Sequence, residues 1–248
     1  MWQVILQLGF HNRSWLVLPI RIPLLLRYQP GEDAVQRMHR QATLADDVVF
    51  VDACTQHGNG MGFYIPGVGW NSFNAPDLLQ YVGYDGNVAD TDINLLEFVA
   101  AIMALCAVIA LWLRKRKKGD AHRHIHIWTD NTSCLSWMST HRAHHPIHLY
   151  LLQVVAFLKA TYNVTVTAGH VPGEVNGFAD AASRNFLLEN GKGPELRRAL
   201  NLLPRVPWPE GLMAAINAVA MRRCCTTSTR VRDALTALAG VRGWCMPR

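Results

Sequence analysis

Charged side chains are scarce in this sequence: Asp, Glu, Lys and Arg make up only 17% of its 248 residues, whereas 50% are hydrophobic. This hydrophobic fraction is large enough for a packed core, which excludes a disordered or low-complexity chain. The six cysteines include no CxxC pair, so neither a zinc ribbon nor a disulfide-stapled scaffold is indicated. Residues 1–10 are apolar but lack the basic segment of a signal peptide. We therefore expect an intracellular protein, in the cytoplasm or the nucleus.

The net charge of +6 is concentrated at one end of the chain. Residues 1–184 hold 14 Lys and Arg against 14 Asp and Glu, whereas residues 185–248 hold 10 against 4. A neutral body followed by a basic tail predicts two units. Such a tail favours a polyanionic partner, either nucleic acid or an anionic membrane.

One long apolar run, Phe98 to Leu113, is followed directly by five basic residues, Arg114 to Lys118. As a helix at about 1.5 Å per residue the run spans about 24 Å, which is shorter than the roughly 30 Å of hydrocarbon in a bilayer. Glu97 and Asn94 lie within the preceding turn. We therefore expect a buried core helix and no membrane, with a single-pass membrane protein as the alternative. The basic run either contacts nucleic acid or ends the helix in solvent.

Five short segments have the composition of β-strands. Asp47–Ala53 is rich in β-branched residues and apolar on both faces, as a central strand should be. The others are Gly62–Gly67, a segment around Trp70 and Leu78–Val82, His122–Thr129 and Val164–Thr167. The first three strands follow one another directly, which predicts an antiparallel meander.

Helical patterns occupy the stretches between and after these strands. The apolar run is the first helix, with Asp92 or Asn94 as its N-cap, and Asn94 and Glu97 have the spacing of a capping box. Further helices are expected at 148–161, 179–184 and 196–203, with a short one opened by Asn131. This order of elements predicts an α/β domain of about 140 residues.

Four acidic residues occupy positions that this order brings together. Asp52 ends the first strand, Asp130 ends the fourth, Glu97 lies in the first turn of the first helix, and Asp180 lies in the last helix. Four ionised carboxylates share a small volume only if cations neutralise them, so the pattern predicts hard divalent metal ions. Two such ions about 3.5–4 Å apart activate a water and stabilise the leaving oxygen in phosphodiester cleavage.

Four segments resemble the ribonuclease H domain of retroelement reverse transcriptases: Val49–Ala53, Leu95–Ala100, Ile127–Thr132 and His170–Arg184. In the last, the pattern His-x-Pro-Gly-x-x-Asn-x-x-Ala-Asp-x-x-Ser-Arg is typical of DIRS-like and pararetrovirus-like elements. The resemblance covers about residues 46–186. It implies the ribonuclease H fold, a five-stranded mixed sheet flanked by helices. One departure from the family pattern is the Cys54–His57 segment. It stands where the family often has small and polar residues that contact the RNA–DNA hybrid.

The resemblance also implies an activity, which is cleavage of the RNA strand of an RNA–DNA hybrid. Two Mg²⁺ ions would serve as cofactors, with Mn²⁺ as a substitute. Asp52, Glu97, Asp130 and Asp180 would be the metal-binding acids, and His170 would assist proton movement or product release. The alternative is a catalytically decayed domain that binds nucleic acid without cutting it.

The remaining parts of the chain are assigned as follows. Residues 1–45 are predicted to be a connection segment, residues 46–186 the ribonuclease H-like domain, and residues 187–248 a linker and a basic helical tail. Within the tail, Thr226–Cys245 is similar to the opening of the amino-terminal DNA-binding domain of tyrosine recombinases, which makes DNA a partner of this segment. His122, His124 and His126 share one strand face without further ligands at metal spacing, which favours a solvated or groove-facing cluster over a metal site.

Overall fold

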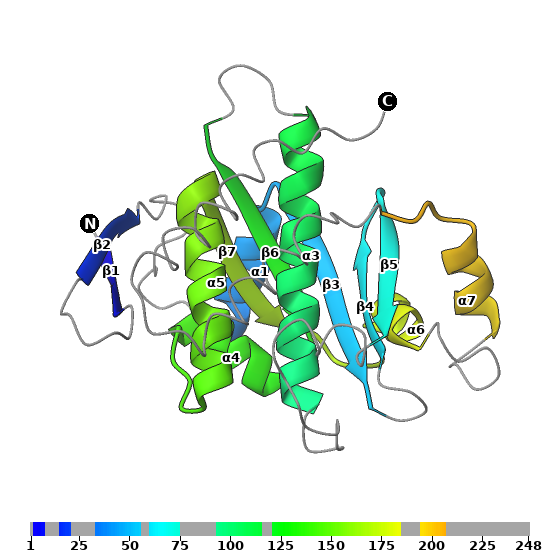
Figure 1. Ribbon diagram of the computed structural model, residues 1–248. Coiled ribbons are helices and arrows are strands. Elements are labelled where there is room, and N and C mark those ends of the chain that lie inside the picture. The colour runs from blue at the N-terminus through cyan, green and yellow to red at the C-terminus, as the bar shows by residue number, and fades with distance from the viewer. Residues whose placement is uncertain are drawn as a thin grey trace.

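The central feature of the computed structural model is a five-stranded sheet with the order β5-β4-β3-β6-β7 (Figure 1). The structure describes residues 2–7, 15–20, 33–55, 60–74, 93–115, 121–184 and 194–206. The strands are β3 (Asp47–Cys54), β4 (Gly60–Ile65), β5 (Gly69–Asn74), β6 (Arg123–Thr129) and β7 (Val164–His170). Strands β3, β4 and β5 pair antiparallel, whereas β3, β6 and β7 pair parallel. This mixed sheet with flanking helices confirms the predicted ribonuclease H-like fold class.

Helices cover both faces of the sheet. On one face lie α3 (Ile93–Lys115), α4 (Thr132–Thr140) and α5 (Pro146–Tyr162). On the other, α1 (Ala34–Thr43) packs on β7 and α6 (Gly177–Ser183) packs on β3 and β4, while α7 (Pro194–Asn201) packs on α6 (Figure 1). Parallel pairing of β3 with β6 requires a crossover between them, and α3 is the helix of that crossover.

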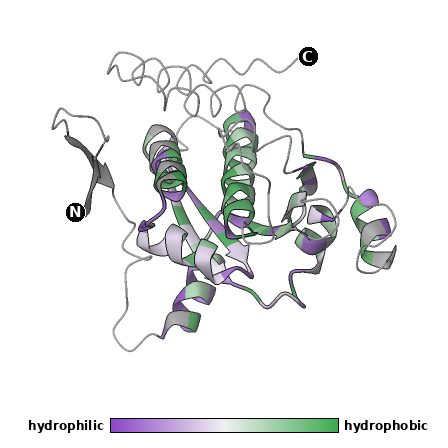
Figure 2. Cartoon of the chain, turned by 60° about the horizontal axis from the view of Figure 1, so that its bottom comes forward, coloured by the Kyte–Doolittle hydropathy of each residue, from purple (hydrophilic) through white to green (hydrophobic). Residues whose placement is uncertain are grey.

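Helix α3 is the centre of the hydrophobic core. Its residues from Leu95 to Ile109 are all buried, and it is green along most of its length in Figure 2. By length and composition it could cross a membrane, yet 89% of its most apolar 18-residue window is buried inside the molecule. A helix that is apolar all round needs cover on every side, and the sheet, α4 and α5 supply it. The core therefore accounts for the hydropathy of this helix.

The start of α3 differs from the expectation. Asn94 is the second residue of the helix, and its Oδ1 accepts a hydrogen bond from Asn131 Nδ2 at 2.9 Å. Glu97 turns toward β3 and does not close a capping box with Asn94, because its carboxylate accepts the N–H of Ala53. The predicted Asn94–Glu97 capping box is therefore wrong. Asp92, the other predicted cap, lies outside the described residues, as do 78–82 of the predicted third strand.

Helix α1 lies ahead of the predicted domain and was not expected from the sequence. Asp33 caps it by accepting from Gln36 N, and the Gln36 side chain accepts in return from Asp33 N. His39 of this helix lies against Trp128 of β6, with ring centroids 5.7 Å apart. The signal for this helix was the Asp33-x-x-Gln36 capping box. Strands β1 (Trp2–Gln7) and β2 (Trp15–Ile20), also unexpected, form a separate antiparallel pair.

Residues 194–206 also dock on the domain, although the sequence assigned them to a linker and tail. The N–H of Val206 donates to the carbonyl of Trp70 at 2.8 Å, and the N–H of Trp70 donates to the carbonyl of Pro204 at 3.2 Å. The guanidinium of Arg205 lies 4.0 Å from the centre of the Trp70 ring. These contacts cover the free edge of β5. The domain boundaries themselves stay predictions.

Candidate metal centre

The register of the two central strands places Asp52 and Asp130 beside each other. Phe50 pairs with Trp128 in the parallel ladder of β3 and β6, so the residues two positions further along each chain reach the same edge of the sheet. Glu97 approaches this edge from the first turns of α3. One carboxylate oxygen of each of Asp52, Glu97 and Asp130 lies within 4.8 Å of the other two. The structure thus brings three of the four predicted acids into one compact group.

Glu97 is tied to both central strands. Its Oε1 accepts from the backbone N–H of Ala53 at 3.0 Å, and its Oε2 accepts from Thr129 Oγ1 at 3.4 Å. The side chain is only 3% exposed. Burial, reinforced by the charges of Asp52 and Asp130, raises the pKa of Glu97 well above its usual range. The position of this carboxylate is therefore fixed by hydrogen bonds, although its charge is unfavourable without a cation.

Asp52 is buried in the same way and has a different partner. Ser183 Oγ donates to its Oδ2 at 2.5 Å. Burial raises the pKa of Asp52 to about 7; the Ser183 hydrogen bond opposes this rise, and the charges of Asp130 and Asp180 add to it. Crowded carboxylates with raised pKa values are the donor set that a hard divalent cation stabilises in ionised form. The residues present therefore fit such an ion.

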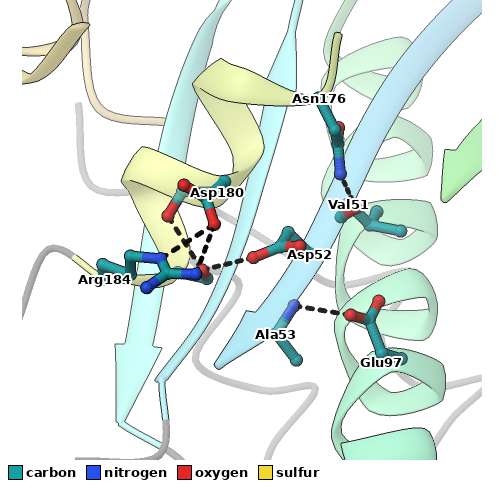
Figure 3. A network of polar contacts seen from close by, with 8 residues as sticks. Val51, Asp52, Ala53, Glu97, Asn176, Asp180 and Arg184 are labelled. Carbon is teal, nitrogen blue, oxygen red and sulfur yellow. Dashed lines mark hydrogen bonds and ion pairs between the residues drawn. The ribbon is translucent and has the colours of Figure 1, made fainter. Parts of the chain in front are cut away.

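Asp180 lies near this group but outside the compact triad. Its Oδ1 accepts from Arg184 Nε at 2.8 Å and forms an ion pair with Arg184 Nη2 at 2.7 Å (Figure 3). Its Oδ2 is buried and has no hydrogen-bond partner among the described residues. One oxygen of the fourth acid is thus neutralised by Arg184, and the other is left for a ligand.

His170, the fifth predicted site residue, is the last residue of β7 and is exposed. It pairs with Thr129, the residue before Asp130, and its backbone N–H donates to Met38 Sδ at 3.5 Å. The chain then passes directly beside the acids, because a Cβ atom added at Gly173 would lie 3.0 Å from Asp130 Oδ2. The imidazole is therefore at the same sheet edge as the carboxylates, on the solvent side.

Two residues of the site were not singled out from the sequence, although both lie in the quoted His170–Arg184 pattern. Asn176 is 1% exposed, and its Nδ2 donates to the carbonyl of Val51 at 2.9 Å, which fastens the loop before α6 to β3 (Figure 3). Ser183 holds Asp52, as described above. The signal was present as polar residues at fixed spacing from Asp180, but only the folded chain shows what they contact.

Close packing of α6 on β4 makes these contacts possible. Gly60 and Gly62 face α6, and a Cβ atom at either position would overlap the backbone of Ser183. Both positions therefore require glycine for steric reasons, and this close approach carries Asp180 and Ser183 to Asp52.

The histidine cluster was expected to be solvated or to face a groove, and burial of His124 and His126 in β6 contradicts this. His124 is 4% exposed and His126 is fully buried, on the face of the sheet where α1 packs. His124 Nε2 and His126 Nδ1 each lie 2.8 Å from Thr167 Oγ1. Burial lowers the pKa of both, that of His126 to about 3. The predicted alternation of the strand is confirmed, because Ile125 and Ile127 face the main core and His124 and His126 face Thr167. The sequence did not predict that α1 covers the histidine face.

The described part of the basic run, Arg114 and Lys115, lies far from the acids. Arg114 and Lys115 end α3, and at about 1.5 Å per residue they lie about 27 Å along the helix axis from Glu97. The rest of the run is outside the described residues. Its contact with nucleic acid stays a prediction.

No protein-family model and no curated protein matches this sequence. Among solved structures, the chain is similar to LC11 ribonuclease H1, isolated from compost and solved in complex with an RNA/DNA hybrid, with 17% identity over 56% of this chain and 95% of that one, and a TM-score of 0.44. It is also similar to ribonuclease H1 of Halobacterium salinarum, with 15% identity over 58% of this chain and 98% of that one, and a TM-score of 0.41. A third similar structure is the N-terminal ribonuclease H domain of a Mycobacterium tuberculosis protein, with 16% identity over 57% of this chain and 92% of that one, and a TM-score of 0.40. At these low values, the fold is established by the strand order of this chain itself.

Proposed function

We propose that this protein is an endonuclease of the ribonuclease H type, which hydrolyses the RNA strand of an RNA–DNA hybrid with divalent cations. The observation that carries the proposal is the triad of Asp52, Glu97 and Asp130, whose oxygens approach within 4.8 Å at one edge of the sheet. The choice of hybrid as substrate rests on the sequence patterns around these acids, above all His170–Arg184.

The acids would hold Mg²⁺, or Mn²⁺ in its place. Bound there, divalent cations would supply activation of a water and stabilisation of the leaving oxygen, with two ions sharing these tasks. Glu97 is set for binding by Ala53 and Thr129, and Asp52 by Ser183. Asp180 would offer its unpartnered Oδ2, since Arg184 already neutralises Oδ1.

His170 would move protons at the exposed side of the site. Its imidazole is in solvent at the end of β7, where its two ring nitrogens can exchange protons with water. The nucleic-acid backbone would approach from this side, because Asp52 and Glu97 are closed off by α6 and α3 behind them.

We further propose that the domain belongs to a retroelement reverse transcriptase polyprotein. The support is the His170–Arg184 pattern, in which Asn176, Asp180, Ser183 and Arg184 all take part in the polar network of the site. Sequencing of the coding locus tests this proposal: a reverse transcriptase reading frame joined to this one is expected, and an isolated cellular gene would contradict it.

The basic tail would bind DNA. Its recombinase-like segment, 226–245, lies outside the described residues, so the support is charge and sequence similarity alone. Mobility shifts of a DNA duplex by the full chain should weaken steeply as salt rises. Unchanged binding after Arg230 and Arg232 are both replaced by Gln would contradict a role of this segment.

The proposed activity is tested with a hybrid labelled on its RNA strand. The full chain should cut it in Mg²⁺ or Mn²⁺, and Asp52→Asn should abolish cutting. Asp33→Asn is the matched control, because Asp33 is an exposed helix cap and Asn caps equally well. Equal activity of wild type and Asp52→Asn would contradict the mechanism. Hybrid binding without any cutting would identify a decayed binding domain instead.

A further inference from the structure

Ser183 links two of the acids from the end of α6. Its Oγ lies 2.5 Å from Asp52 Oδ2 and 2.9 Å from the backbone carbonyl of Asp180, and the residue is 1% exposed. A serine hydroxyl has one proton to donate. The carboxylate is the stronger of the two acceptors, so the proton is directed to Asp52.

The position of this hydroxyl is fixed by contacts that do not involve Asp52. The backbone of Ser183 lies so close to Gly60 and Gly62 that a Cβ atom added at either glycine would overlap it. One turn earlier, Asp180 is held by Arg184. Helix α6 is held in turn by α7 and by the stacking of Phe178 on Tyr64, with ring centroids 4.7 Å apart. The donor is therefore rigid, and the carboxylate adapts to it.

Each of the other buried acids already has its own partner. Glu97 accepts from Ala53 and Thr129, and Asp180 accepts from Arg184. Within the described part of the chain, Ser183 is the residue whose side chain donates to Asp52. Removal of its hydroxyl would deprive Asp52 of this side-chain donor.

We propose that Ser183 is a positioning residue, which holds one oxygen of Asp52 so that the carboxylate is set for a divalent cation before the cation arrives. The proposal rests on the cation site of the proposed function. Hydrogen-bond donors behind metal ligands act in this way, and their loss weakens metal binding by roughly 10-fold to 100-fold.

The test is cation binding by the full chain without nucleic acid, read from the electron paramagnetic resonance signal of free Mn²⁺. Ser183→Ala should bind Mn²⁺ about 10-fold more weakly than wild type. Ser139→Ala is the matched control, since Ser139 is exposed on α4, and it should bind as wild type does. Ser183→Thr keeps the hydroxyl and should recover most of the affinity.

Urea unfolding in chelator separates positioning from a purely structural role. If Ser183→Ala lowers only the unfolding midpoint and the folded variant binds Mn²⁺ as wild type does, the proposal is overturned. It is also overturned if Ser183→Thr folds but loses as much affinity as Ser183→Ala. Should Ser183→Ala not fold, the threonine variant decides: affinity close to that of wild type supports the proposal, and a 10-fold loss contradicts it.

Failure of this proposal and failure of the nuclease assignment give different results. If wild type binds Mn²⁺ but does not cut the hybrid, the nuclease assignment is contradicted, and the comparison of Ser183 variants still tests the positioning proposal. If wild type cuts the hybrid and Ser183→Ala binds Mn²⁺ with unchanged affinity, only the Ser183 proposal is contradicted. If wild type binds no cation, both the nuclease assignment and the Ser183 proposal are contradicted.

Discussion

The carboxylate of Glu97 accepts a hydrogen bond from the backbone N–H of Ala53, 3.0 Å away. Ala53 follows Asp52 directly, so this bond ties α3 to the strand position that carries the neighbouring acid. Two mutually repelling groups are therefore held together by the fold, and their repulsion is relieved when a cation binds.

Asp52→Asn should stabilise the cation-free protein. Asp52 has a pKa of about 7 when folded and about 4 when unfolded, so the folded state binds more protons between these values. The protonated form of Asp52 therefore favours the folded state below pH 4, and this stabilisation is lost as pH rises to 7. In chelator at pH 8, urea unfolding should show the variant more stable by up to roughly 4 kcal/mol. The advantage should shrink as pH falls toward 4. If Asp52→Asn and wild type have equal free energies of unfolding at pH 8 as well as near pH 4, this explanation is refuted.

Acid should destabilise the protein through His126. The pKa of this buried histidine is about 3 when folded and about 6.5 when unfolded, so the unfolded state binds more protons between these values. Its neutral form therefore supports folding above pH 6.5, and that support declines as pH falls toward 3. His126→Gln should make the unfolding free energy less dependent on pH in this window, at a cost of about 1–3 kcal/mol at pH 7. His144→Gln, at an exposed position, should leave the slope unchanged.

Gly62→Ala should weaken cation binding as well as stability, because the added methyl group would push α6, with Asp180 and Ser183, away from β4. Gly67 is the control. It has a positive φ of 72° and open space around it, so Gly67→Ala should cost about 1 kcal/mol of backbone strain. Its Mn²⁺ affinity should equal that of wild type. Equal loss of affinity in both variants would argue against a specific role of the β4 and α6 contact.

The docking of α7 predicts a contrast between two leucines of one segment. Leu200 is 1% exposed, whereas Leu202 is 87% exposed. Leu200→Ala should lower the free energy of unfolding by about 2–5 kcal/mol, while Leu202→Ala should change it by less than about 0.5 kcal/mol. If thermal unfolding shows no loss for Leu200→Ala, residues 194–206 are not part of the cooperative unit.

The sequence predicted the central sheet well because its strands carry strong local signals. The apolar Asp47–Ala53 segment and the alternating His122–Thr129 segment are recognisable without knowledge of their neighbours. The acids at their ends then follow from the topology, since parallel neighbours place their carboxyl ends at one edge.

The partners of the acids could not be predicted in the same way. The bonds of Ser183 to Asp52 and of Asn176 to Val51 join residues 131 and 125 positions apart in the chain. Such contacts depend on how closely α6 approaches the sheet, which two glycines on β4 determine. Likewise, burial of His126 depends on α1, whose capping box of two residues does not indicate where the helix packs.

The most direct test of the central claim uses a hybrid with different labels on its RNA and DNA strands, incubated with the full chain in Mg²⁺. We predict that the RNA strand is cut and the DNA strand is not, and that chelator or Asp130→Asn stops the reaction. Cutting of both strands, or of RNA alone with Asp130→Asn as active as wild type, would contradict the claim that Asp52, Glu97 and Asp130 form the catalytic metal centre.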